Sequence, residues 1–345
     1  MKIVLASTFV PFVNGGYRFI VESLEQKLQE HGHEVERIYL PFVEHPDALL
    51  EQMVALRLID LSEKSDRLIC FRPPAYLLPH PNKVLWFIHH LRVYYDLWDS
   101  EYRPVPNTPQ GRALRHNLMA ADQVGMSEAR LLFTNSKVVS ERVRHFNNLD
   151  SEVLYPPLLN PQDFHCDGYG DEIVYVSRVE HHKRQHLVVE AMAHTRTAVK
   201  LRICGLSLNG QYTNMINRRI DELGLRERVS FENRWISDAE KIEILSRALA
   251  VTYLPVDEDS YGYPSLEAGH ARKPVITTSD AGGVPELIVD GLNGYVCDPD
   301  AKTLAEAFDR VFMDRQLAEQ MGAAAQQRIL DLNICWDHVI GKLLS

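Results

Sequence analysis

The chain alternates short apolar or β-branched runs with longer stretches of helical periodicity, and this alternation constrains its fold most. Apolar runs separated by helical connections are typical of parallel sheets buried on both faces. The predicted strands of the first half are 3–6, 35–40, 67–71, 84–88, 130–134 and 153–155, and its predicted helices are 17–31, 109–124 and 136–146. The predicted strands of the second half are 173–176, 201–204, 229–231, 250–254 and 274–277. We therefore predict an α/β fold.

A stretch of prolines, glycines and polar residues at 156–170 separates the two alternating sets, and it predicts a linker. The length of 345 residues is enough for two domains, each with its own core. We place the first domain at 1–165 and the second at 166–329. Two doubly wound domains that face each other would bind ligands in the cleft at the carboxyl ends of their strands.

Composition excludes several classes of protein. The charge of 37 − 47 = −10 argues against a nucleic-acid partner, because phosphate contacts need a basic surface. The five cysteines are odd in number and lack zinc or redox spacing, which predicts reduced, mostly buried thiols in a cytoplasmic protein. No window approaches the ~20 apolar residues of a spanning helix, so only peripheral contact with the inner membrane face stays open.

The stretch 250–268 predicts a strand, an acidic loop and a helix in succession. Gly262 and Pro264 punctuate the end of the loop, and Pro264 marks the start of the helix. Glu267 is then expected in the first helical turn, beside free backbone amides. A carboxylate there can accept hydrogen bonds from two neighbouring sugar hydroxyls, and the amides suit a phosphate. An acidic loop that only caps a helix is the alternative.

This stretch reads D-S-Y-G-Y-P-S-L-E, and it resembles the E-G-F-G-L-P-x-L-E signature of the retaining family-4 glycosyltransferases. Asp259 stands in place of the first Glu, with one methylene less reach, and Glu267 in place of the second. The resemblance implies that Glu267 binds the nucleotide ribose and that Asp259 and the amides after it bind the donor sugar. The donor-binding residues that it implies in this stretch are Ser260, Tyr261, Gly262, Tyr263, Pro264 and Glu267.

The resemblance also implies a GT-B fold, with two Rossmann-like domains. Residues 1–165 would form the acceptor-side domain and 166–329 the domain that binds the nucleotide sugar. A terminal helix at about 330–345 would cross back onto the first domain.

The segment 177–184 follows the first strand of the second domain. Cations at such a strand exit suit a diphosphate whose charge grows as a glycosidic bond breaks. The segment resembles the family's G-R-x-x-x-x-K-G loop, with Arg178 and Lys183 at the matching spacing and Ser177 and Arg184 in place of the glycines. We assign phosphate binding to Arg178 and Lys183, and a solvated surface to Arg184 and the neighbouring histidines.

In the first domain, Gly15 and Gly16 follow the first predicted strand. Two glycines let backbone approach a ligand, although a tight turn would use them equally well, and no dinucleotide-binding fingerprint is present. The pair resembles the family's glycine loop at the donor phosphates.

His89 and His90 end another strand and point to opposite faces, so they cannot readily share a metal ion. The resemblance places His89 near the donor sugar, with His90 as the one-residue alternative.

Two aromatic segments carry weaker signals. The turn 231–238 precedes a helix that Ser237 or Asp238 would cap, and the resemblance implies that it borders the nucleobase. Trp235 or Arg234 could stack on a base, and a half-buried Trp235 is the alternative. The aromatic residues of 91–102 could stack on the sugar rings of an acceptor, or belong to an ordinary packed helix. The segments 280–286 and 290–294 also resemble family patterns and are expected to form turns.

Together these features predict a retaining, metal-independent hexosyltransferase. It would move a sugar from a nucleotide sugar to the hydroxyl of a carbohydrate or glycolipid acceptor, in bacterial polysaccharide or glycoconjugate synthesis. The predicted catalytic residues are His89, Arg178, Lys183 and Asp259, and no cofactor is expected. The alternatives are a transferase that holds a metal on Asp257 and Asp259, a nucleotide-sugar epimerase, and a non-catalytic binding protein.

Overall fold

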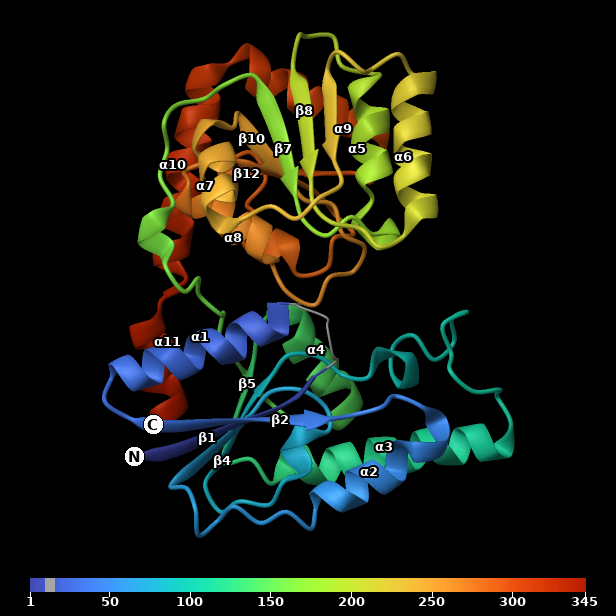
Figure 1. Cartoon of the computed structure of the whole chain (residues 1–345), viewed down its shortest axis with the longest axis vertical. Helices are drawn as coiled ribbons and strands as arrows, with labels where there is room; N and C mark the ends of the chain where they lie inside the picture. Colours follow the sequence, from blue (N-terminus) through green and yellow to red (C-terminus); the bar gives the residue numbers. More distant parts are fainter. Residues whose placement is uncertain (10–15) are drawn as a thin grey trace. The chain divides into compact units, whose positions relative to one another are not determined.

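The structure is a computed structural model, and it describes residues 1–9 and 16–345. The chain divides into two compact units, each shown in Figure 1. Unit 1 comprises Met1–Pro156 together with Cys335–Ser345, and unit 2 comprises Pro157–Ile334. The functions that the sequence assigns to two such domains stay predictions.

Unit 1 contains a sheet of six parallel strands in the order β2-β1-β3-β4-β5-β6. The chain passes from β1 out to the edge strand β2 and then back to β3 on the other side of β1. The strands are β1 (Lys2–Phe9), β2 (Glu34–Pro41), β3 (Arg67–Cys70), β4 (Lys83–Phe87), β5 (Leu131–Thr134) and β6 (Glu152–Val153). Every residue of β3 and β4 is buried, as expected of strands covered on both faces.

Side chains cap the starts of two helices of unit 1, and a glycine follows the end of a third. Thr108 caps α3 by accepting a hydrogen bond from the Gly111 amide at 3.2 Å, and Ser136 caps α4 by accepting from the Val139 amide at 3.1 Å. Beyond α1, Gly32 adopts a positive φ of 81°. The helices are α1 (Gly16–Glu30), α2 (Leu49–Leu56), α3 (Pro109–Ser127), α4 (Lys137–Asn147) and the terminal α11 (Trp336–Leu344).

Unit 2 contains a second parallel sheet, in the order β12-β11-β10-β7-β8-β9. Its strands are β7 (Glu172–Val176), β8 (Lys200–Cys204), β9 (Val229–Glu232), β10 (Ala250–Thr252), β11 (Val275–Thr278) and β12 (Gly294–Cys297). Its helices are α5 (Gln185–Met192), α6 (Gly210–Glu222), α7 (Asp238–Arg247), α8 (Tyr263–His270), α9 (Ala301–Met313) and α10 (Arg315–Asp331). Figure 1 shows α5, α6 and α9 on one face of this sheet and α7, α8 and α10 on the other, the arrangement of a doubly wound fold.

The predicted α/β alternation is confirmed, and the differences are local. The predicted strand 250–254 keeps only its first three residues in the sheet, because the chain turns away after Thr252. Helices α2, α9 and α10 and strand β12 were not predicted. The cysteines are all free, but only Cys70 and Cys204 are buried, so the expectation of mostly buried thiols is wrong. Among the described residues, no helix is both long and apolar enough to cross a membrane.

Candidate functional site

The point at which strand order reverses in unit 2 brings two predicted site segments together. From β7 the chain moves outward through β8 and β9, then returns to β10 on the other side of β7. Ligands of doubly wound sheets bind beyond the carboxyl ends of the strands at such a switch point. The cation-bearing segment 177–184 follows β7 and the acidic segment 253–262 follows β10, so both emerge there.

Tyr175 links the two segments through its hydroxyl group. This hydroxyl, at the buried end of β7, donates to the backbone carbonyl of Lys183 and accepts from the backbone amide of Leu254 at 3.1 Å. The amide of Val256 in turn donates to the carbonyl of His182 at 2.8 Å. The two strand exits are therefore fixed to each other before any ligand is present.

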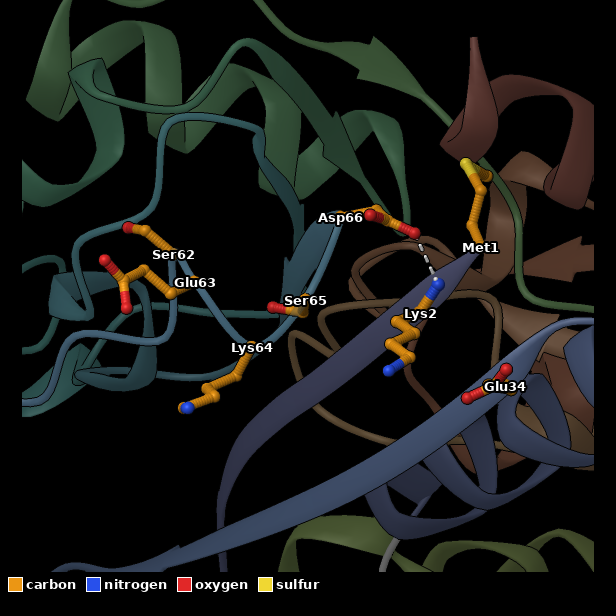
Figure 2. Close-up of a pocket in the computed structure, with 8 residues that line it drawn as sticks. All are labelled: Met1, Lys2, Glu34, Ser62, Glu63, Lys64, Ser65 and Asp66. Atoms are coloured by element: carbon orange, nitrogen blue, oxygen red, sulfur yellow. Dashed lines mark hydrogen bonds between the residues drawn. The ribbon is translucent and has the colours of Figure 1, made fainter.

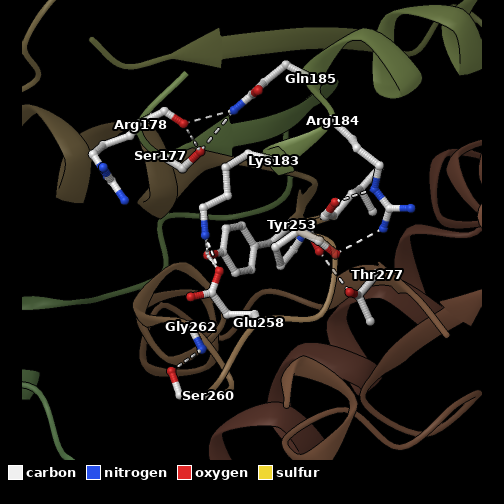
Figure 3. A network of polar contacts seen from close by, with 12 residues as sticks. Ser177, Arg178, Lys183, Arg184, Gln185, Tyr253, Glu258, Ser260, Gly262 and Thr277 are labelled. Atoms are coloured by element: carbon white, nitrogen blue, oxygen red, sulfur yellow. Dashed lines mark hydrogen bonds and ion pairs between the residues drawn. The ribbon is translucent and has the colours of Figure 1, made fainter. Parts of the chain in front are cut away.

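Lys183 lies at the centre of the candidate site. Its side chain is buried, and Figure 3 shows its ammonium group directed at Glu258 and the Tyr253 hydroxyl. The ammonium forms a close ion pair with the Glu258 carboxylate and donates to the Tyr253 hydroxyl at 2.7 Å. Burial works to raise the pKa of Glu258, but Lys183 and the Tyr253 hydroxyl outweigh it, so this pKa lies below its ordinary value. Glu258 was missed because an ion pair between residues so far apart in sequence leaves no local pattern.

Arg178 and Arg184 have different roles from each other. The exposed Arg178 guanidinium forms no ion pair or hydrogen bond with another described residue. Figure 3 shows that Arg178 belongs to the same segment after β7 as Lys183. Arg184 was expected at a solvated surface, and that expectation is wrong. Its guanidinium donates to the carbonyl of Leu254 at 2.8 Å, to Thr278 Oγ1 at 2.7 Å and to Asp280 Oδ1 at 2.8 Å.

The backbone at position 184 suits the glycine of the family pattern that this segment resembles. Arg184 adopts a φ of 55°, in the left-handed region that glycine enters without steric conflict. In this chain the side chain contributes compensating hydrogen bonds that glycine could not. Arg184 is therefore a structural clamp between the β7 exit and the ends of β10 and β11.

The acidic segment rests on the turn that contains Gly282 and Gly283. The amide of Asp257 donates to the Asp280 carbonyl at 2.9 Å, and the amide of Gly283 donates to the Glu258 carbonyl at 2.8 Å. A Cβ at Gly282 would lie 2.2 Å from the Glu258 carbonyl oxygen, and the φ there is +65°. The close approach thus requires glycine, and the expected turn at 280–286 supports the loop that carries Asp259.

The remaining residues of the signature lie at the start of α8. Asp259 and Ser260 are partly exposed, and the Ser260 hydroxyl accepts from the Gly262 amide at 3.3 Å. Tyr261 is buried, Gly262 caps the helix with a φ of 71°, and Tyr263 and Pro264 are its first two residues.

Glu267 lies deeper than the sequence indicated. It is the fifth residue of α8, and the first turn holds no acidic residue, so the expected contact with free helix amides is wrong. Its buried carboxylate instead accepts from Lys241 at 2.6 Å. Burial raises the pKa of Glu267, and the Lys241 ammonium offsets part of that rise.

Trp235 is largely free of the core. Its side chain is 71% exposed, so the half-buried alternative is wrong. Arg234, the other stacking candidate, is held between Glu232 at 2.6 Å and Glu240. Ser237 caps α7 by accepting from the Glu240 amide at 3.2 Å, as predicted.

In unit 1, His89 and His90 follow β4 and separate as their alternation predicts. His90 is buried, donates from Nε2 to Asn147 Oδ1 at 2.8 Å, and packs against Phe87 and Tyr95. His89 is partly exposed, and its Nε2 accepts from Arg72 Nε at 3.2 Å. Burial, and then the Arg72 charge, lower the pKa of His89 to about 3, so its imidazole is neutral at physiological pH. Gly15 lies outside the described residues, and Gly16 is the exposed first residue of α1.

The aromatic segment proposed for the acceptor is mostly core. It forms a short 3₁₀ turn (Arg92–Tyr94) in place of a longer helix, and Tyr94, Tyr95 and Trp98 are buried. Only Tyr102, at 63% exposure, keeps a ring available for stacking among the tyrosines and tryptophan of this segment.

Unit 1 also contains an open hollow of about 510 Å³ at the other edge of its sheet (Figure 2). It is lined at the amino-terminal ends of β1 and β2 and by residues 62–66 before β3. Ligands of doubly wound sheets bind at the opposite, carboxyl-terminal edge, so this hollow is not the candidate site.

Comparisons with known proteins agree with the geometry of unit 2. Residues 166–328, nearly all of this unit, match the family model described as "Glycosyl transferases group 1". The chain is 34% identical over 127 residues to the alpha-1,3/1,6-mannosyltransferase ALG2 of Dictyostelium discoideum, covering 37% of this chain and 30% of that protein. It is 25% identical over 212 residues to the alpha-maltose-1-phosphate synthase of Mycolicibacterium smegmatis, covering 58% of this chain and 54% of that protein. The chain spans about half the length, or less, of the curated relatives it matches.

Solved structures resemble the whole chain. Anabaena Alr3699/HepE, crystallised in complex with UDP, has a TM-score of 0.74 at 18% identity, covering 100% of this chain and 99% of that one. The sucrose-phosphate synthase (tll1590) from Thermosynechococcus elongatus also has a TM-score of 0.74 at 18% identity, covering 99% and 98%. At such identities the likeness shows the fold alone, and it confirms the predicted GT-B class.

Proposed function

We propose, from the premise that the chain belongs through residues 166–328 to the group 1 glycosyl transferases, that it transfers a sugar from a nucleotide diphosphate to an acceptor hydroxyl. One observation carries this proposal above the others. Arg178, Lys183 and the 257–262 loop emerge together at the switch point of the unit 2 sheet, where such folds bind their ligands.

Arg178 and Lys183 supply the charge that this reaction needs. As the glycosidic bond breaks, negative charge grows on the departing diphosphate, and preorganised cations stabilise it. In the proposed reaction the acceptor oxygen bonds to the anomeric carbon from the same face, and its proton passes to the departing phosphate oxygen. We propose that these two cations take the place of a metal ion.

Glu267 and Asp259 would hold the rest of the donor. The Glu267 carboxylate, kept in place by Lys241, has the capacity to accept from both ribose hydroxyls. Asp259 would contact the transferred hexose together with the amide of Ser260. The exposed ring of Trp235 is our candidate to stack on the base.

Relatives support a nucleotide sugar as the donor and a carbohydrate as the acceptor. HepE was crystallised with UDP and with UDP-glucose, and TarM of S. aureus with fondaparinux, alpha-GlcNAc-glycerol and UDP. We propose a carbohydrate or glycolipid acceptor, in polysaccharide or glycoconjugate synthesis, and a cytoplasmic protein with peripheral contact at the inner membrane face.

A thermal-shift screen of UDP-, GDP-, ADP- and dTDP-sugars tests the donor, because a ligand that binds the folded state raises the melting temperature. We expect one base to stabilise the chain and transfer to require an added acceptor. Conversion of the donor without an acceptor would identify an epimerase, and no stabilisation by any of the four would contradict nucleotide binding. Loss of transfer in a chelator would instead place a metal ion on Asp257 and Asp259.

A further inference from the structure

Unit 1 contains a buried cation without an anionic partner. Arg72 follows β3 and is only 8% exposed, and its Nη1 has no hydrogen-bond partner among the described residues. Its Nε donates to the neutral imidazole of His89 at 3.2 Å, and its guanidinium stacks 4.2 Å from the ring centre of Tyr17. A buried N–H without an acceptor is unfavourable, and a buried charge without a counterion more so.

The surroundings do not neutralise this charge. Glu44 acts on Arg72 electrostatically, but its side chain is exposed, and no carboxylate that the structure describes forms an ion pair with Arg72. By contrast, the buried Lys83 of the same unit pairs with Glu128 at 2.9 Å. Among the described residues, a carboxylate side chain therefore pairs with the buried Lys83 and none pairs with Arg72.

The location of Arg72 favours a ligand over a structural role. In unit 1 the strand order reverses between β1 and β3, and Arg72 lies two residues beyond the carboxyl end of β3. His89 lies two residues beyond the carboxyl end of the neighbouring β4. Both residues thus lie at the edge where doubly wound sheets bind their ligands.

We propose that Arg72, held in orientation by His89, binds an anionic group, a phosphate or a carboxylate, carried by the acceptor. The planar Arg72 guanidinium suits an oxyanion, which would accept from Nη1. His89 fixes the guanidinium orientation: its Nδ1 lies 2.7 Å from the His90 carbonyl, which leaves Nε2 as the acceptor for Arg72. Describing the anion as part of the acceptor depends on the proposed transfer reaction; the anion site itself does not.

The first experiment measures inorganic phosphate binding by calorimetry on the full chain. Arg178→Gln removes a cation of the unit 2 site and serves as the background. The double variant Arg178→Gln/Arg72→Gln is compared with Arg178→Gln alone. We expect Arg72→Gln to weaken phosphate binding about tenfold or more, as loss of a charged hydrogen bond would. The matched control is Arg115→Gln, because Arg115 is another arginine of unit 1 that donates a hydrogen bond, to the Tyr94 carbonyl at 2.7 Å, and lies over an aromatic ring. Unchanged phosphate affinity in the Arg72 variant overturns the site.

The second experiment identifies the source of the anion. In the Arg178→Gln background, glucose 6-phosphate or glucuronate should bind more tightly than glucose, and Arg72→Gln should abolish that preference. In a chain that is otherwise wild type, Arg72→Gln should not change the affinity for UDP. A loss of UDP affinity as large as the loss of phosphate affinity would show that Arg72 binds the donor, and it would overturn the assignment of the anion to the acceptor. If no nucleotide sugar bound to the wild type, the proposed transfer would fail, while the phosphate and sugar-phosphate results would still decide the Arg72 site. The melting temperature of Arg72→Gln should not fall, because this change removes an uncompensated charge.

Discussion

Lys183 shows how one residue can serve both the stability of unit 2 and its chemistry. Lys183→Met would leave Glu258, whose side chain is 27% exposed, without its counterion, which should cost less than the roughly 3–5 kcal/mol of fully buried pairs. Adding Glu258→Gln should restore the melting temperature, yet leave the transfer rate down by about 10²–10³, the usual effect of losing one preorganised donor. Lys200→Ala, an exposed lysine of the same unit, is the control. A double variant with near-normal turnover would contradict the phosphate role of Lys183.

Glu267 should make nucleotide affinity depend on pH. Burial raises its pKa, and ribose hydroxyls are best bound by the ionised carboxylate, so affinity should decline on acidification at a higher pH than an ordinary glutamate would give. Lys241→Met removes the cation that offsets burial, and it should move this decline to still higher pH. Dissociation constants measured by calorimetry across pH check both statements. If nucleotide affinity declined at the same pH in the wild type and in Lys241→Met, Lys241 would not control the pKa of Glu267.

The contribution of the glycine turn can be tested at the scale of the element. Gly282→Ala would place a methyl group against the Glu258 backbone, and it should displace the 257–260 segment and weaken nucleotide binding at least several-fold. Gly291 has a similar φ of +73° but open space where a Cβ would lie. Gly291→Ala should therefore lower the free energy of unfolding only by the cost of a left-handed backbone at alanine, about 1–2 kcal/mol. Chemical denaturation and nucleotide calorimetry on both variants separate the two effects. Equal nucleotide affinities would mean that the loop does not depend on this contact.

Elements were easier to predict from the sequence than the contacts between them. The runs 67–71 and 84–88 predicted β3 and β4 because consecutive apolar residues suffice to identify a buried strand. The clamp made by Arg184 was missed because its acceptors lie 70 and more residues away. Glu258 and the unpaired Arg72 were missed for the same reason: tertiary packing determines which charges meet, and sequence spacing does not. Glu267 was placed one residue too early in α8, because Pro264 is the second residue of this helix and not its first.

At the scale of the whole molecule, the two units have separate hydrophobic cores. We therefore predict that pH can change the stability of one unit without changing that of the other. Asp122 in unit 1 is fully buried and accepts from the Tyr95 hydroxyl at 2.7 Å. Burial raises its pKa to about 6 from an ordinary 3.8, so the folded state binds this proton more tightly than the unfolded state. The stability that this proton contributes is fully present below pH 3.8 and is lost as pH rises through 6, by about 3 kcal/mol in total.

Tryptophan fluorescence can follow this loss in unit 1, because Trp86, Trp98 and Trp336 are buried there while Trp235 of unit 2 is exposed. In a Trp235→Phe background, urea unfolding of unit 1 should require less denaturant at pH 7 than at pH 5. Asp122→Asn removes the titrating proton and should flatten that dependence, while nucleotide affinity in unit 2 stays unchanged. Persistence of the same pH dependence in Asp122→Asn would assign it to groups other than Asp122.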